Sequence, residues 1–373
     1  MSDLKNTAVS VLGSVGLGSI TRAVREFRSA IGASTATIRP YAAGVANYRN
    51  DRFHNSEPSS TFTPAGGRTS ILSSVLFRSR IGRPAADIPL ATPLAPADAG
   101  ELAVTWFGHA SALIEIDGQR VLADPVWSER VSPTSVVGPA RLHPNPVAVK
   151  SLPRVDAIVV SHDHYDHLDR ATIVQLSKHQ DAPFVVPIGL GAHLRSWGVV
   201  DARIVELDWG SSVSVGALTV TCTEARHFSG RGLARDTTLW SSWSIAGPGH
   251  KVYFGGDTGY TRRFTEIGTE LGPYDLTLLP VGAYDEHWPD IHMNPEEAVR
   301  AHADLCAGDA TYGLLVPIHW ATFNLAFHPW AEPVQRATAA ADAAGTSIFV
   351  PMPGQRIDAL RPAEQEKWWS GIA

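Results

Sequence analysis

The part of this sequence that most restricts its fold is a succession of short apolar segments that begins at about Ala103. Such segments, rich in Val, Ile and Leu and bounded by glycine or polar residues, are typical of β-strands, and the longer amphipathic segments between them are typical of helices. Strands in the first half, with helices interspersed through the rest, predict an α/β sandwich. We expect strands at residues 104–107, 112–116, 120–123, 156–160, 184–186, 217–222, 241–245, 251–254, 276–279 and 314–317. We expect helices at residues 169–177, 261–271, 295–306 and 330–343.

Composition excludes several classes of protein. Of the 373 residues, 44% are hydrophobic and 18% are charged, which fits a globular chain and not a disordered one. The formal net charge of −6 argues against a nucleic-acid partner. Cys222 and Cys306 are too few for a disulfide framework and are expected to be reduced thiols. Because no apolar run is long enough to span a membrane, we expect a cytoplasmic location.

The N-terminal segment has the pattern of a basic amphipathic helix, and two interpretations of it remain open. We favour a helix that docks on the body of the protein or frays in solvent. The alternative is a helix on a membrane surface, which leaves peripheral membrane contact open. The apolar positions are Ile20, Val24, Phe27 and Ile31, and the basic positions between them are Arg22, Arg25 and Arg28.

A dense group of metal-binding residue types follows the apolar strand at 156–160. His162 and His164 are two residues apart, so both imidazoles can point the same way where the strand ends. Asp166 and His167 lie beyond, where the chain must turn, and can be directed at a second point. Imidazole and carboxylate without thiolate suit Zn²⁺, with Fe or Mn as alternatives. A solvated polar loop is the competing interpretation, but this pattern is rare by chance.

Three further candidate ligands follow other apolar strands. They are His227, Asp257 and His319. The glycines before Asp257 would let its carboxylate approach a metal closely. A single histidine after a strand is usually structural, but the shared position of these residues at strand ends predicts that they complete the metal site.

The segment from Ser161 to His167 resembles the metallo-β-lactamase superfamily, and further motifs resemble its N-acyl-phosphatidylethanolamine-hydrolysing phospholipase D family over about residues 45 to 355. The resemblance implies an α/β fold of four layers, an αβ/βα metallo-β-lactamase sandwich with an N-terminal extension. The motifs are Trp106-Phe107-Gly108-His109-Ala110, Leu122 to Ser128, Gly138-Pro139-Ala140-Arg141, His162 to Asp169, Leu207-Asp208-Trp209, Trp240 to Ser244, Gly256 to Tyr260, Pro295 to Ala298 and, in the arm, Arg52 to Asn55.

The chain is divided accordingly into three parts. Residues 1–44 form an N-terminal helix or tail, and residues 45–100 form an extended arm that packs on the core. The arm is assigned because residues 33 to 100 are rich in Ser, Thr, Pro, Gly and Ala and show little periodicity. Residues 101–373 form the catalytic domain of the metallo-β-lactamase fold.

The resemblance also implies two zinc ions per chain and the identity of their ligands. One zinc is held by His162, His164 and His227, a second by Asp166, His167 and His319, and Asp257 bridges them. A hydroxide between the metals then attacks phosphorus in line. The family places a histidine just before its Pro-Glu-Glu helix, near the substrate phosphate, so Asp257 and His292 are the expected catalytic residues. His54, His109, Asp124 and Asp163 lack the strand-end position and are expected to orient ligands or to be structural.

Aromatic residues lie close in sequence to every candidate ligand. We expect about half of them to be packing, and the others to line an apolar cleft for acyl chains. The expected substrate-binding residues are Tyr165, Tyr260, Tyr284 and Trp320.

The predicted function is therefore a dinuclear zinc phosphodiesterase of the phospholipase D type. Its expected substrate is N-acyl-phosphatidylethanolamine or a related phosphodiester. The alternative is a zinc hydrolase of lactones or β-lactams that uses the same site, because a metal hydroxide attacks carbonyl carbon as well. A homo-oligomer remains open.

Overall fold

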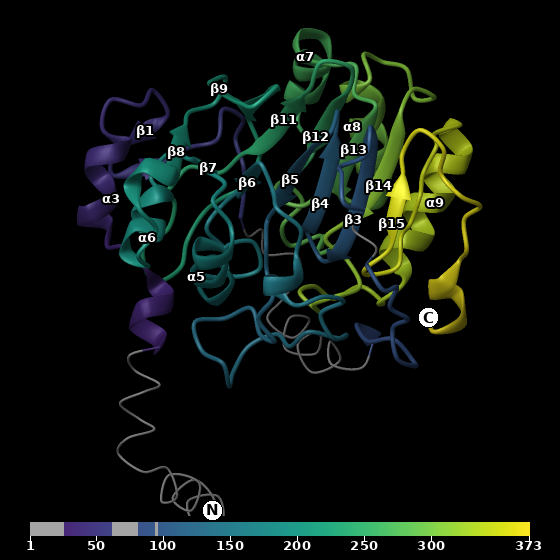
Figure 1. Ribbon diagram of the computed structural model, residues 1–373, viewed down its shortest axis with the longest axis horizontal. Helices are drawn as coiled ribbons and strands as arrows, with labels where there is room; N and C mark the ends of the chain where they lie inside the picture. The colour runs from purple at the N-terminus through teal and green to yellow at the C-terminus, as the bar shows by residue number, and fades with distance from the viewer. Residues whose placement is uncertain (1–25, 62–80, 94–95) are drawn as a thin grey trace, which may run out of the picture.

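The computed structural model describes residues 26–61, 81–93 and 96–373, and it contains two large β-sheets with helices on their outer sides (Figure 1). The first sheet has the strand order β15-β3-β4-β5-β6-β7-β8, and the second has the order β14-β13-β12-β11-β10-β9. The strands of the first sheet are β3 (Leu102–Gly108), β4 (Ser111–Ile116), β5 (Gln119–Ala123), β6 (Ala157–Val159), β7 (Phe184–Pro187), β8 (Ile204–Leu207) and β15 (Arg356–Asp358). Those of the second are β9 (Ser212–Val215), β10 (Leu218–Thr223), β11 (Ser242–Ala246), β12 (Lys251–Phe254), β13 (Leu276–Pro280) and β14 (Leu314–Ile318).

The helices divide between the two sheets. One apolar cluster joins β5, β6 and β7 to α5 (Arg170–His179) and α6 (Gly191–Ser196) on the outer face of the first sheet. The helices α7 (Arg263–Glu270), α8 (Pro295–Leu305) and α9 (Glu332–Ala344) pack on one another and on the second sheet. Figure 1 shows α5 and α6 at the left and α9 at the right, on opposite sides of the sheets. This is the expected order of layers, and the α/β fold is confirmed.

The inner strands, such as β3, β4 and β13, are buried along their whole length because each face of the sheet is covered there. In β3, Val104 and Trp106 belong to the core that contains both sheets, whereas Phe107 belongs to the cluster under α5. The turn between β4 and β5 has positive φ at Asp117 and Gly118, as the hairpin pattern predicts. The start of α8 is also as predicted, because Asn294 caps it and forms a capping box with Glu297.

The N-terminal part contains more helix than its composition indicates. Residues 26–31 are helical and are called the N-terminal helix below; the rest of the predicted basic helix lies outside the described residues. The chain was expected to be extended after residue 33, but α3 (Thr35–Ala42) follows, with Ser34 as its N-cap. The side-chain oxygen of Ser34 accepts the backbone N–H of Thr37, which supplies the helix start that the periodicity of this segment does not show.

The arm lies against the core. A short hairpin, β1 (Tyr48–Arg49) and β2 (Arg52–Phe53), places the buried Phe53 in a cluster with Ala225, Leu239 and Trp240. Farther on, the backbone N–H of Ala85 donates to the carbonyl of Ile372 at 2.8 Å. Among the residues that the structure describes, none belongs to a helix that is long and apolar enough to cross a membrane.

Candidate metal centre and active site

The candidate ligands lie on the loops that follow four strands. The metal loop, residues 161–168, follows β6, while His227 follows β10, Asp257 follows β12 and His319 follows β14. A glycine is required before Asp257, because Gly256 has a φ of +57° and a Cβ there would lie 2.4 Å from that of Ser161.

Three imidazoles converge at one point among these loops. Nε2 of His162 and Nδ1 of His164 are 2.8 Å apart, and Nε2 of His227 is 3.3 Å from the same Nδ1. His162 and His227 are buried, whereas His164 is half-buried and faces a cavity. The structure thus brings together the first predicted triad.

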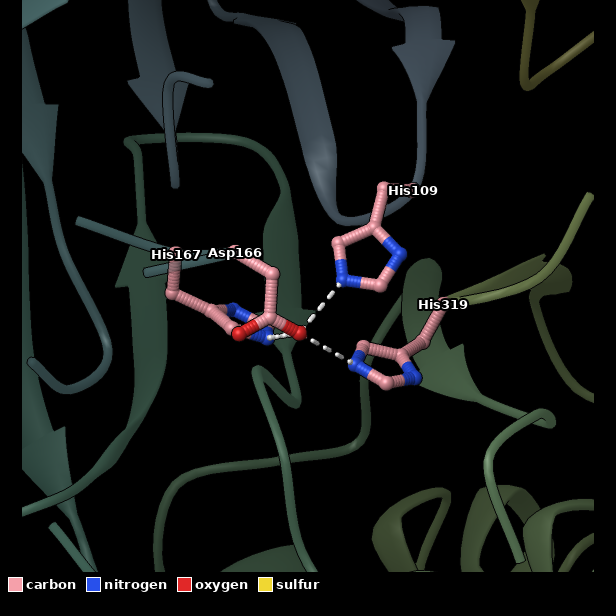
Figure 2. A group of neighbouring side chains, drawn as sticks. All are labelled: His109, Asp166, His167 and His319. Carbon is pink, nitrogen blue, oxygen red and sulfur yellow. Dashed lines mark hydrogen bonds and ion pairs between the residues drawn. The ribbon is translucent and has the colours of Figure 1, made fainter. Parts of the chain in front are cut away.

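A second cluster forms around the carboxylate of Asp166 (Figure 2). Its Oδ2 lies 3.5 Å from Nε2 of His167 and 3.4 Å from Nε2 of His319. The fourth member is His109, whose Nε2 is 2.9 Å from the same oxygen. His109 therefore touches a candidate ligand, the position expected of a residue that orients Asp166.

Asp257 lies between the two clusters. Its Oδ2 is 3.7 Å from Nε2 of His227 in the first cluster and 3.2 Å from Nε2 of His167 in the second. Its Oδ1 is 3.0 Å from Nε2 of His319. A single carboxylate thus faces both groups of ligand atoms.

Protonation states at the site favour a cation. Burial holds the pKa values of His162 and His227 well below the ordinary value, so these imidazoles are neutral. Burial alone would raise the pKa of Asp257, but the nearby His167 and His319 hold it well below its usual range. Neutral imidazoles and an ionised carboxylate are the forms that bind metals. The carboxylates of Asp257 and Asp166 raise the pKa of His319 to about 9, against the effect of burial, so the site attracts positive charge, and a metal ion bound by His319 would displace the proton of this ring.

The unpaired atoms at the site also fit a metal. Within the described part of the chain, Nε2 of His167, Nε2 of His319 and Oδ1 of Asp257 are buried, and their only close polar neighbours are one another and the other oxygens of Asp257 and Asp166, without a regular hydrogen bond. Buried polar atoms without regular hydrogen bonds are costly, and a cation would satisfy all three. The opposite nitrogen of His227, Nδ1, is 2.9 Å from the carbonyl of Ile291, a contact that directs Nε2 toward the cluster.

A cavity of about 220 Å³ opens onto the ligands. Its apolar wall consists of Phe228, Ala283, Trp288, Ile291 and Leu325. The remaining lining residues are polar: Thr61, His164, Asp166, Asp257, His292 and His319.

His292 is the expected catalytic residue of this cavity that belongs to neither ligand set. Its ring centroid is 5.1 Å from that of His227 and 5.3 Å from that of His319. Its Nδ1 is buried and has no hydrogen-bond partner among the described residues. Burial lowers the pKa of His292 to about 4, so the ring is neutral and one of its nitrogens carries a proton that can be donated.

The four aromatic residues expected to bind substrate lie in different places. Tyr284 lines an adjoining cavity of about 490 Å³ that His292 also lines, and its hydroxyl donates to Glu332 at 2.6 Å. Tyr165 lines another cavity, of about 410 Å³, on the far side of the metal loop.

Tyr260 and Trp320 are not part of the described lining of the catalytic cavity. The hydroxyl of Tyr260 donates to Asp304, and its ring packs beside Phe264. Trp320 is 2% exposed and stacks on Trp106, because the positive φ of His319 turns the chain so that the indole enters the core. Phe228 and Ile291 line the cavity instead. Their positions in the sequence indicate this, since Phe228 follows the candidate ligand His227 and Ile291 precedes His292.

The other residues that are expected to orient ligands or to be structural are Asp124, Asp163 and His54, and each makes different contacts. The carboxylate of Asp124 accepts the backbone N–H of Ser161 at 2.7 Å. Asp163 contacts His193 and the backbone of Gly230. His54 instead lies 3.2 Å from the carbonyl of Arg49, in the arm. The arm reaches the site through Asn55, whose Nδ2 donates to the carbonyl of His227 at 2.8 Å.

Comparison with known proteins agrees with this geometry. A family model described as a β-lactamase superfamily domain matches residues 119–320. The chain is 56% identical over 352 residues to an uncharacterized protein of Mycobacterium tuberculosis, which covers 94% of each chain. It is 39% identical over 236 residues to N-acyl-phosphatidylethanolamine-hydrolyzing phospholipase D 1 of Caenorhabditis elegans, which covers 60% of this chain and 65% of that one.

Two further similarities concern metal-dependent hydrolases. The chain is 32% identical over 223 residues to a metal-dependent hydrolase of Pyrobaculum neutrophilum, which covers 60% of this chain and 85% of that one. Among solved structures, Igni18, a metallo hydrolase from the archaeon Ignicoccus hospitalis, is similar with a TM-score of 0.52 and 24% identity, over 69% of this chain and 97% of that one. The similarity to Igni18 shows a shared fold and nothing more.

Proposed function

Because the chain belongs to the metallo-β-lactamase superfamily and is a metal-dependent hydrolase, we propose that it is a dinuclear zinc phosphodiesterase of the phospholipase D type. The observation that carries the proposal is the position of Asp257 between two sets of ligand atoms. A site for one metal would not need a second complete set.

The two sets divide the ligands as follows. His162, His164 and His227 hold one ion, and the imidazole nitrogens favour zinc over a harder cation. Asp166, His167 and His319 hold the other, with Fe or Mn as alternatives. Two such ions, when bound, activate water at neutral pH and stabilise the negative charge that develops on phosphoryl oxygens.

The remaining residues of the cavity bind the substrate. His292 donates a hydrogen bond to a phosphoryl oxygen, since its ring lies beside both ligand sets and its Nδ1 has no hydrogen-bond partner among the described residues. The apolar wall, which includes Phe228, Trp288 and Leu325, contacts the acyl part of a lipid. Tyr284, in the adjoining cavity, contacts the part of the substrate that extends past His292.

N-acyl-phosphatidylethanolamine or a related phosphodiester is the proposed substrate class. The similarity to the N-acyl-phosphatidylethanolamine-hydrolyzing phospholipase D 1 of Caenorhabditis elegans supports this choice. Hydrolysis breaks the bond between phosphorus and the oxygen of the amide-bearing alcohol. The oxygen of water goes to phosphorus, and a proton goes to the released alcohol.

The experiment is a parallel assay of the purified protein. We expect hydrolysis of N-acyl-phosphatidylethanolamine and of bis(p-nitrophenyl) phosphate, and little turnover of a lactone or a chromogenic cephalosporin. Turnover of the lactone or cephalosporin without turnover of either diester would replace the proposal with the alternative hydrolase.

A lipid substrate also requires contact with a membrane surface. Three apolar side chains on loops are well exposed: Val136 at 72%, Val137 at 69% and Leu233, which is fully exposed. The loop of Leu233 also carries Arg235, whose guanidinium lies 4.3 Å from the ring centre of Phe228. We expect Leu233→Asp to weaken sedimentation with anionic liposomes and to spare hydrolysis of the soluble diester. Equal sedimentation of variant and wild type would argue against this surface.

A further inference from the structure

Arg231 lies buried between the N-terminal helix and the metal loop. It is 5% exposed, and its Nε donates to the carbonyl of Ala30, at the end of the helix, at 2.9 Å. Its Nη1 donates to the carbonyls of Asp163 at 2.6 Å and Leu168 at 2.8 Å. Residues 164–167, which include the candidate ligands His164, Asp166 and His167, lie between these two carbonyls. One guanidinium therefore binds both ends of this segment.

Two aromatic rings fix the guanidinium in place. It lies 4.1 Å from the ring centre of Tyr165, in the metal loop, and 5.1 Å from that of Trp197. The hydroxyl of Tyr165 donates back to the carbonyl of Arg231 at 2.6 Å. Nε1 of Trp197 donates to the carbonyl of Ser29 at 2.7 Å, so the same indole contacts the N-terminal helix.

A second connection runs parallel to the first. The backbone N–H of Ala33 donates to Nδ1 of His193 at 2.9 Å, which leaves the proton of that ring on Nε2. This Nε2 is 3.4 Å from Oδ2 of Asp163, and the other oxygen of Asp163 accepts the backbone N–H of Gly230 at 2.7 Å. In Figure 1 the N-terminal helix is the lowest part of the purple segment, and its C-terminal end, the end nearer α6, is thus joined twice to the metal loop.

We propose that Arg231 is a positioning residue of the metal centre, which fastens the metal loop to residues 29–33 and so sets the positions of the ligands in that loop. The inference rests on the proposed metal site but not on the identity of the substrate. Without the guanidinium, the carbonyls of Asp163 and Leu168 lose their donors in a buried place, and the loop must move to satisfy them. A metal site tolerates little displacement of its ligands.

The test compares two arginines that make similar contacts, one buried and one half-buried. Arg203 also donates to backbone carbonyls, those of Ser177 and Ala182, and its guanidinium lies 5.2 Å from the ring centre of Phe184, but it contacts no residue of the metal loop. Metal affinity is measured on the full chain by competition with a chelator, and the ligand geometry by the visible spectrum of the Co²⁺-loaded protein.

We expect Arg231→Met to weaken metal binding by about tenfold or more and to change the Co²⁺ spectrum. Arg203→Met is expected to lower thermal stability while leaving affinity and spectrum as in the wild type. Trp197→Phe keeps a ring beside Arg231 but removes the donor to Ser29, so it should weaken metal binding in the same direction by a smaller factor. It also serves as the test if Arg231→Met does not fold.

Wild-type metal affinity and spectrum in Arg231→Met, or in Trp197→Phe if the former is unfolded, would overturn the inference. Equal weakening in Arg203→Met would do so too, because the effect would then be one of general stability. A wild type that binds two metals but hydrolyses no phosphodiester would overturn the proposed function alone, whereas a wild type that binds no metal would overturn both.

Discussion

Asp124 accepts a hydrogen bond from Nδ1 of His167 at 2.6 Å, and both side chains are fully buried. This contact keeps a proton on Nδ1, so Nε2, which faces the second ligand cluster, is the nitrogen left to bind a metal. The carboxylate of Asp124 is itself held by the backbone N–H and the hydroxyl of Ser161. The orientation of a candidate ligand is thus fixed by Asp124, which directly follows β5; the expectation that Asp124 has no strand-end position is wrong.

Asp124→Asn should weaken binding of one of the two metals by about 10- to 100-fold, the usual cost of losing such a partner. The amide can donate to Nδ1 and so move the proton of His167 to the nitrogen that faces the metal. The check is metal content after dialysis against a weak chelator. The control is Asp156→Asn, since within the described part of the chain the carboxylate of Asp156 accepts only the backbone N–H of Arg120, at the opposite end of β6 from the metal loop. Equal retention of metal in both variants would contradict the role of Asp124.

His292→Ala should keep its full metal content and lose about tenfold or more in turnover of a phosphodiester. With a pKa of about 4 the ring is neutral at neutral pH, so it acts as a hydrogen-bond donor to phosphate and not as a charged acid. The loss should therefore be similar for an alkyl and a nitrophenyl leaving group. A much smaller loss with nitrophenyl would show a general acid instead, and unchanged rates for both substrates would remove His292 from the site.

The contact between His250 and Asp117 should make stability depend on pH. Nδ1 of His250 lies 2.7 Å from Oδ1 of Asp117, and this hydrogen bond raises the pKa of His250. Burial would raise the pKa of Asp117, but hydrogen bonds from His250 and the backbone of Gly249 lower it. The contribution of His250 is complete below its unfolded pKa of about 6.5 and is lost as pH rises through the raised value. That of Asp117 is complete above about pH 4 and is lost as pH falls through the lowered value.

The pair therefore stabilises the protein most between about pH 4 and 6.5. His250→Gln should cost about 1 kcal/mol in that window and less at alkaline pH. The measurement is the difference in Tm between variant and wild type at a mildly acidic and an alkaline pH. A difference that is the same at both values would show that the charge of His250 contributes nothing.

Much of the fold is encoded locally and could be predicted. The segment that forms β12 is apolar and bounded by polar or glycine residues, and its predicted and observed ends agree. Other elements depend on distant parts of the chain. In β9 serine and valine alternate on a half-exposed edge, and β15 is recognisable as a strand only through its pairing with β3. In α3, Pro40 interrupts the pattern of a helix.

The candidate site also contains some residues that could be predicted from the sequence and others that could not. Ligand candidates such as Asp257 could be predicted because a polar side chain after an apolar strand is locally visible. Arg231 and Leu325 could not, because each acquires its role from contacts with segments remote in sequence. The side to which Trp320 points depends on the backbone conformation of His319, which no sequence pattern indicates.

The position of Asp257 between two ligand sets is the central claim, and metal stoichiometry tests it most directly. Metal analysis should find two transition-metal ions, chiefly zinc, in each wild-type chain. Asp257→Ala removes a ligand from both, so it should hold fewer ions and lose activity by orders of magnitude. A wild type with one ion per chain, and the same content in Asp257→Ala, would contradict the account.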